Sequence, residues 1–197
     1  MKAPDLIEPV LGYRVWRVRD GLLHPWCQHG PWMPGEPEPA RCLCAGTTHA
    51  APASGCHCGF HALHSLDAKL GSFSVRDYAT SADGRHMGVL GRTQGWVGWV
   101  AGAVVAWGRL EVHGNSFRAE FAKPVVVIRG PNARMCDEVA RRYSCALVPI
   151  EDVEQVARRY GTVVPQDLRP SLETGISAGS DEDLGEEIDF LRDDEAA

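Results

Sequence analysis

Residues 96–128 read WVGWVAGAVVAWGRLEVHGNSFRAEFAKPVVVI, and this stretch decides the fold. It opens with a long apolar run interrupted by glycines, which are typical of bends and bulges in strands. Residues 113–116, HGNS, predict a turn, and residues 117–122 then alternate apolar and polar side chains before the apolar run PVVVI at 124–128. Alternation with a period of two is typical of a strand with one buried face. The stretch therefore predicts an antiparallel β meander over 96–128, as a sheet or a small barrel.

Two segments on the N-terminal side add to this core. Residues 13–18, YRVWRV, alternate and predict a first strand, with Tyr13 and Val15 on one face and Trp16 on the other. Residues 59–70, GFHALHSLDAKL, carry apolar side chains every three or four positions, which predicts a helix.

The C-terminal side changes pattern at residue 131. Residues 132–143 predict an amphipathic helix that begins near an Asn132 cap, residues 146–149 a short strand, and residues 150–160 a second helix. The chain is thus predicted to be a single α+β domain over residues 1–170, a small antiparallel β barrel or sheet with an α-β-α appendage at 131–161. The 44% share of hydrophobic residues is enough for a substantial core.

Charge is concentrated at the C-terminal end. The chain carries a formal charge of −6, but residues 180–197 alone contain nine acids and one arginine. The remainder has two more bases than acids. Blocks of like charge repel each other and often serve as interaction tails, so residues 171–197 are predicted to form an acidic mobile tail. Apolar side chains recur within it at helical spacing, which predicts a docking motif for a protein partner: Leu184, Ile188, Phe190 and Leu191.

The cysteines are clustered rather than spread. Five of the seven lie between residues 27 and 58, and no secretory signal or transmembrane run is visible, so we expect a cytoplasmic protein with reduced thiols and no membrane contact. Residues 42–58 lack the pattern of a helix or a strand, and a bound ion would supply the order that they lack.

Zinc in a structural site takes four nitrogen or sulfur ligands in a tetrahedron. The spacing Cys-x6-His-x6-Cys-x-Cys provides such a set from one loop: Cys42, His49, Cys56 and Cys58. Cys44 could replace Cys42 or His49, and Cys27 lies further upstream. We therefore expect a closed Zn²⁺ site over residues 42–58. Reduced cysteines in a metal-free loop are the alternative.

The same region resembles a family of actinobacterial proteins of unassigned function. The resemblance spans roughly residues 13–130 and is carried by YRVWRV, the Trp-x-Pro-Gly loop in PWMPGEP at 31–37, the cysteine–histidine cluster that ends in Cys-x-Cys-Gly, and a strand around Trp107. It implies Cys42, His49, Cys56 and Cys58 as the recurrent ligand set and leaves Cys27 and Cys44 as extras. The resemblance implies no particular substrate and no particular reaction.

Nucleic-acid binding is one functional alternative. The sequence VARRY occurs at 139–143 and again at 156–160, and its arginines could form a phosphate-binding patch or simply complement the helix dipoles: Arg141, Arg142, Arg158 and Arg159. A β surface could stack bases between flanking arginines at 109 and 118, or its aromatic side chains could fill a core: Trp96, Trp99, Trp107, Phe117 and Phe121.

Enzymatic chemistry has little support in the sequence. No P-loop, dinucleotide-binding or nucleophile-elbow motif occurs, and the zinc-hydrolase and deaminase patterns are absent. Glu111 and His113 are predicted to face opposite sides of a strand. We therefore expect a non-enzymatic zinc-containing adaptor or regulatory protein that contacts a protein or nucleic acid, with a nucleic-acid or modified-base reader and an unrecognised enzyme as the alternatives.

Overall fold

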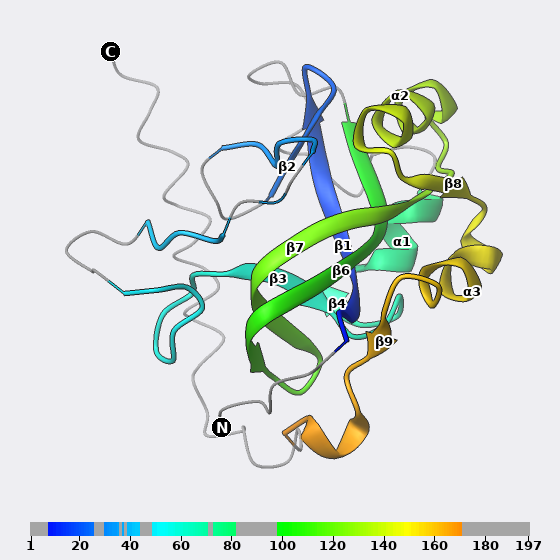
Figure 1. Ribbon diagram of the computed structural model, residues 1–197. Helices are drawn as coiled ribbons and strands as arrows, with labels where there is room; N and C mark the ends of the chain where they lie inside the picture. The colour runs from blue at the N-terminus through cyan, green and yellow to red at the C-terminus, as the bar shows by residue number, and fades with distance from the viewer. Residues whose placement is uncertain are drawn as a thin grey trace.

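A computed structural model describes residues 8–25, 30–35, 37, 39–43, 49–70, 73–81 and 98–170 of the 197-residue chain. Its largest feature is a long antiparallel hairpin, the two strands that cross the centre of Figure 1, formed by β6 (Gly98–Val112) and β7 (Ser116–Ile128). The turn lies at 113–115, as the sequence predicted. The two runs expected at 117–122 and 124–128 form one strand, because Pro124 lies at a register shift where its missing N–H is tolerated.

The sheet closes into a near-ring of antiparallel strands. β1 (Val10–Arg19) pairs with β6 along nearly its whole length, and β3 (Phe60–Leu63) pairs with β7. β1 and β3 meet at Tyr13 and Leu63, which completes the ring β1–β6–β7–β3. The predicted antiparallel α+β fold is confirmed. β2 (Leu22–His24) folds back on β1 at the edge of the sheet.

The helix predicted over 59–70 is wrong. Its first half is β3, in which Phe60 pairs with Ala119 of β7, and a turn follows that brings Leu66 into the core. Gly59 has a φ of +111°, which no helix accommodates. Apolar spacing of three to four residues over a short run does not separate a helix from a strand followed by a turn, and pairing with β7 decides the outcome here.

Short elements follow the turn. β4 (Lys69–Leu70) and β5 (Phe73–Ser74) form a two-stranded ribbon that leads into helix α1 (Val75–Thr80). Ser74 caps this helix by accepting a hydrogen bond from the backbone N–H of Asp77, whose carboxylate accepts the N–H of Ser74 in return.

The C-terminal segment has the predicted α-β-α order. Asn132 caps α2 (Ala133–Tyr143), and β8 (Ala146–Val148) adds to the sheet parallel to β7. The second helix is shorter than the predicted 150–160, since a 3-10 turn, η2 (Ile150–Asp152), leads into α3 (Val153–Ala157). β9 (Thr162–Val163) then pairs with the start of β1, and η3 (Gln166–Leu168) ends the described chain.

Apolar side chains form two clusters on the two faces of the sheet. Along β1, Trp16 and Val18 belong to the cluster that contains Phe117 and is covered by α2, whereas Val15 belongs to the cluster covered by α1 and α3. Neighbouring residues of β1 therefore stabilise opposite faces, as the predicted alternation requires. Among the helices that the structure describes, none has the length and apolar composition needed to cross a membrane. The predicted acidic tail at 171–197 lies outside the described residues.

Candidate metal centre

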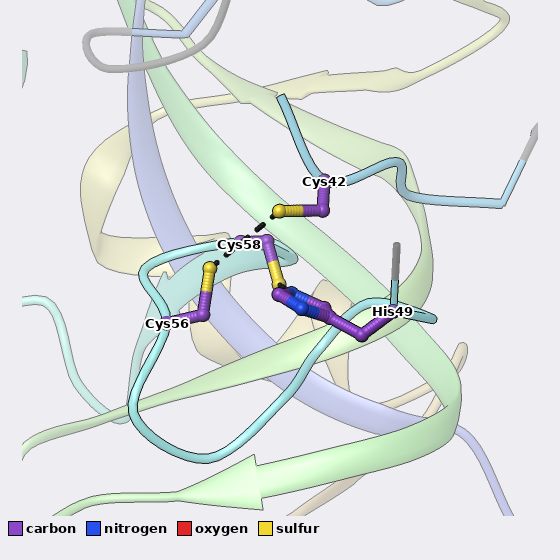
Figure 2. A group of neighbouring side chains, drawn as sticks. All are labelled: Cys42, His49, Cys56 and Cys58. Carbon is purple, nitrogen blue, oxygen red and sulfur yellow. Dashed lines mark hydrogen bonds between the residues drawn. The ribbon is translucent and has the colours of Figure 1, made fainter. Parts of the chain in front are cut away.

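Three cysteines and one histidine converge beside the β6–β7 hairpin. The Sγ atoms of Cys42, Cys56 and Cys58 and one ring nitrogen of His49 all lie within 4.8 Å of one another. Figure 2 shows the four side chains directed at a common centre from two backbone segments. The Cys42 and Cys56 sulfurs are 3.6 Å apart, and His49 Nε2 is 3.2 Å from Cys58 Sγ. The structure therefore brings together the four residues that the sequence proposed as ligands.

These separations suit a tetrahedral metal site. With zinc–sulfur bonds of about 2.3 Å and zinc–nitrogen bonds of about 2.0 Å, tetrahedral edges are roughly 3.8 Å between two sulfurs and 3.5 Å between sulfur and nitrogen. The Cys42–Cys56 sulfur separation of 3.6 Å and the His49–Cys58 separation of 3.2 Å are close to these edges. A disulfide needs about 2.05 Å, so Cys42 and Cys56 are not joined by a disulfide. The donor set fits a divalent metal ion with affinity for sulfur.

The segment that carries Cys42 is anchored to the sheet. The backbone N–H of Ala40 donates to the carbonyl of Glu120 in β7, and Arg41 forms an isolated antiparallel bridge with Ala50. Cys42 follows Arg41, and His49 precedes Ala50, so this antiparallel bridge places the two ligands opposite each other. Two ligands from separate segments are thus aligned by backbone pairing.

The other two ligands lie on a tight turn. The N–H of Cys56 donates to the carbonyl of Ala53, and Gly55 supplies a φ of +77° within that turn. Cys58 then precedes Gly59, at which an added Cβ would lie 3.0 Å from Pro52 Cβ and 3.2 Å from Arg118 Cβ. Glycine lets the loop pass close to β7.

Two arginines of the β6–β7 hairpin donate hydrogen bonds to backbone carbonyls of this loop. Arg118, only 8% exposed, donates from Nη1 to the carbonyl of Cys58 at 3.2 Å and forms an ion pair with Glu111 at 2.7 Å. Arg109 donates to the carbonyl of Ala51 at 3.1 Å and pairs with Glu120. Both arginines that the sequence offered as flanks of a base-stacking surface are therefore engaged in anchoring this loop.

Burial governs the thiol chemistry of the site. Burial, and then a hydrogen bond with Cys56, raises the pKa of Cys58 to about 11. The thiol is therefore protonated at neutral pH unless a cation stabilises the thiolate. A metal ion does so, and its binding releases the proton.

A row of polar side chains lies next to the loop on β3, β7 and β6. His61 is opposite Arg118, and Arg118 is opposite Glu111. Burial, followed by the charge of Arg14, lowers the pKa of His61 to about 4, so this imidazole is neutral at neutral pH. Glu111 and His113 share a face, contrary to the sequence prediction, because residues two apart on a strand point the same way. His113 Nε2 is 4.0 Å from Glu111 and 3.4 Å from Arg118 Nε.

A cavity of about 210 Å³ adjoins the metal cluster. Trp32 and Phe60 lie edge to face with centroids 4.9 Å apart and line it, together with Met33 and Leu43, which are 62% and 57% exposed. Arg41 and Lys123 are the charged side chains among the described lining residues. This cavity could not be predicted from the sequence, since its walls come from three separate segments.

The arginines of the two VARRY sequences do not gather into one patch. Arg142 donates to the carbonyl of Asp20, just beyond the end of β1, whereas Arg159 lies three residues before Thr162, which pairs with the start of β1. A ten-residue strand is about 33 Å long, so α2 and α3 present their arginine pairs at opposite ends of it. All four residues are exposed: Arg141, Arg142, Arg158 and Arg159.

The aromatic residues proposed as a base-stacking surface differ in burial. Phe117 is fully buried, whereas Trp99, Trp107 and Phe121 are half-buried. Trp107 stacks on Phe121 with centroids 5.8 Å apart, and Trp99 lies 6.1 Å from Tyr78, so each of these rings packs against another ring of the protein. Several residues lie outside the described part of the chain: Cys27, Cys44, Trp96, Leu184, Ile188, Phe190 and Leu191.

Comparison with protein-family models, curated protein sequences and solved structures found no significant match. No family is thus shown for the chain, although the structure does bring together the four residues of the Cys-x6-His-x6-Cys-x-Cys motif.

Proposed function

We propose that Cys42, His49, Cys56 and Cys58 bind one Zn²⁺ ion as a closed structural site. The single observation that carries this proposal is the convergence of four ligand atoms within 4.8 Å. Three thiolates and an imidazole are a common zinc donor set, and four protein ligands leave no position for a reactive water. The ion fixes the loop over the hairpin and does not catalyse a reaction.

The protein then works as a non-enzymatic, cytoplasmic adaptor or regulatory protein that contacts a protein or nucleic-acid partner. Two observations support this role. The described cysteines form no disulfide, which fits a reducing compartment. The aromatic cavity beside the loop provides a surface on which partner side chains can pack. The apolar residues of the acidic tail are a second proposed contact: Leu184, Ile188, Phe190 and Leu191.

The zinc site is tested by native mass spectrometry of the purified chain before and after treatment with a strong chelator, with circular dichroism in parallel. We expect one tightly held zinc and loss of ordered structure on its removal. Cys58→Ser should abolish zinc retention, while the matched variant Cys145→Ser, outside the cluster, should retain it. A chain that holds no metal, or loses it without structural change, would contradict the proposal.

The partner role is tested by comparing the wild type with a chain in which Leu184, Ile188 and Leu191 are changed to serine. We expect the altered tail to capture fewer partner proteins in a crosslinking experiment, with zinc content unchanged. Equal capture by both chains would exclude the tail as the contact. Salt-dependent retention of nucleic acid instead would favour a reader of nucleic acid.

A further inference from the structure

The three thiols of the metal cluster differ in their access to solvent. Cys58 is 6% exposed and interacts with His49, whereas Cys42 and Cys56 are each only partly buried. The two accessible sulfurs are also in mutual contact, 3.6 Å apart, although 14 residues separate them in the chain. In Figure 2 their side chains approach each other directly.

We propose that Cys42 and Cys56 form an oxidation-sensitive pair, which a hydroperoxide converts into a disulfide with release of the bound ion. The proposal rests on the zinc site above, because the ion keeps both sulfurs as thiolates, the form that reacts with peroxides. The site would thus change its metal content with the supply of peroxide.

The chemistry needs one molecule of hydroperoxide for each pair. One thiolate attacks a peroxide oxygen and becomes a sulfenic acid, and the O–O bond breaks to release hydroxide or an alkoxide. The second thiolate attacks the sulfenic sulfur, the S–S bond forms and hydroxide leaves. Two thiolates have then lost two electrons in total, and the peroxide has gained them.

Geometry favours this pair over other combinations. Formation of the bond requires the sulfurs to close from 3.6 Å to about 2.05 Å, and rotation about the Cys42 and Cys56 side-chain bonds moves sulfur on that scale. Cys56 and Cys58 are two residues apart, and Cys58 is the least accessible of the three. The oxidised pair would remove two ligands at once, and His49 and Cys58 alone do not hold a zinc ion tightly.

The described cysteines outside the cluster are expected to react slowly. Burial raises the pKa of Cys145 to about 12 and also raises the pKa of Cys136. Burial outweighs the nearby charges of Lys123 and Arg129 at these two thiols, and neither belongs to the metal cluster. We therefore expect the paired cysteines to be oxidised at least about tenfold faster than these two.

The experiment uses the full chain, reduced and loaded with zinc, and hydrogen peroxide as the probe. Zinc release is followed with a chromogenic chelator, and disulfides are mapped by mass spectrometry of a digest prepared without reductant. We expect one zinc released for each Cys42–Cys56 disulfide formed, and recovery of the site after dithiothreitol and fresh zinc. A disulfide between Cys56 and Cys58, or between Cys42 and Cys44, would overturn the proposal, as would zinc release without any disulfide.

Matched variants separate this proposal from the proposed function. Cys27→Ser, Cys44→Ser and Cys145→Ser should each release zinc as the wild type does, and loss of release in any of them would overturn the assignment of the pair. Zinc content before peroxide tests the metal site by itself. A chain without zinc that still forms the Cys42–Cys56 disulfide would contradict the zinc site and the coupled release, while a zinc-bound chain that resists peroxide would contradict the oxidation alone.

Discussion

Arg118 and Cys58 are 60 residues apart in the chain, yet the Arg118 guanidinium donates to the Cys58 carbonyl and, from another nitrogen, to the Glu111 carboxylate. One buried side chain thereby joins the metal loop to both strands of the central hairpin. We expect the loop to depend on this contact as well as on the proposed zinc ion.

Arg118→Ala should destabilise the zinc-loaded chain by about 2–3 kcal/mol, because it removes the donor to the Cys58 carbonyl and the 2.7 Å ion pair with Glu111 in a largely buried setting. Urea unfolding measures the effect. The matched variant is Arg109→Ala, whose side chain is 48% exposed and whose loss should cost about 1 kcal/mol or less. Equal costs for the two variants would show that burial of Arg118 is not what matters.

Gly59→Ala should destabilise the protein and weaken zinc retention. The backbone has a φ of +111° there, and the new methyl group would meet Pro52 and Arg118. Strain of this kind costs about 1–3 kcal/mol before any displacement of the loop. Gly55→Ala is the control, since it also has a positive φ, +77°, but nothing within 4 Å of an added Cβ. Chelator competition and urea unfolding should show the larger loss for position 59.

Stability should fall as the pH is lowered from 7 to 5, in part because of His61. Its pKa falls from 6.5 to about 4 on folding, so the unfolded chain binds the proton first in this window. The stabilisation is present above pH 6.5 and is lost as pH falls toward 4, by about 2 kcal/mol at pH 5. The measurement is the difference in unfolding free energy between wild type and His61→Asn at both pH values.

In this pH experiment the titration of the metal ligands is common to both chains and cancels in the comparison. A pH dependence unchanged in His61→Asn would show that this imidazole is not buried as described.

If the protein binds nucleic acid through the two arginines that follow α3, Arg158→Ala with Arg159→Ala should lower affinity and reduce the slope of log affinity against log salt by about 2. The control is Arg141→Ala with Arg142→Ala, which lies at the other end of β1 and should have little effect. Fluorescence anisotropy with a labelled duplex provides the measurement. Equal losses in both double variants would indicate a diffuse electrostatic contact.

The sequence predicted those elements of the fold that depend on residues only a few positions apart. Alternation in 13–18 and 117–122 identified strands, and Asn132 identified the start of α2, since cap and period act within a few residues. The helix expected at 59–70 failed because its apolar spacing fits a strand and a turn equally well. The partner that selects the strand, β7, lies more than fifty residues away.

The candidate site shows the same division. The four ligands could be predicted from their spacing, because all of them lie between residues 42 and 58. The anchoring of the loop by Arg118 and Arg109 could not be predicted from the sequence. It depends on the register of β6 and β7 and on a bulge between Trp107 and Leu110. The separation of the two VARRY ends likewise follows from β8 and β9 pairing with different strands.

Cys42 stands between Arg41 and Leu43, and both of these neighbours line the aromatic cavity. The proposed metal ligand Cys42 is therefore flanked on both sides by residues of the cavity wall. A molecule that fills the cavity only when residues 41–43 are held in place would raise the affinity for the ion, and the ion would raise the affinity for that molecule by the same factor. Binding in the cavity and binding of the ion would then be coupled through the ordering of these three residues.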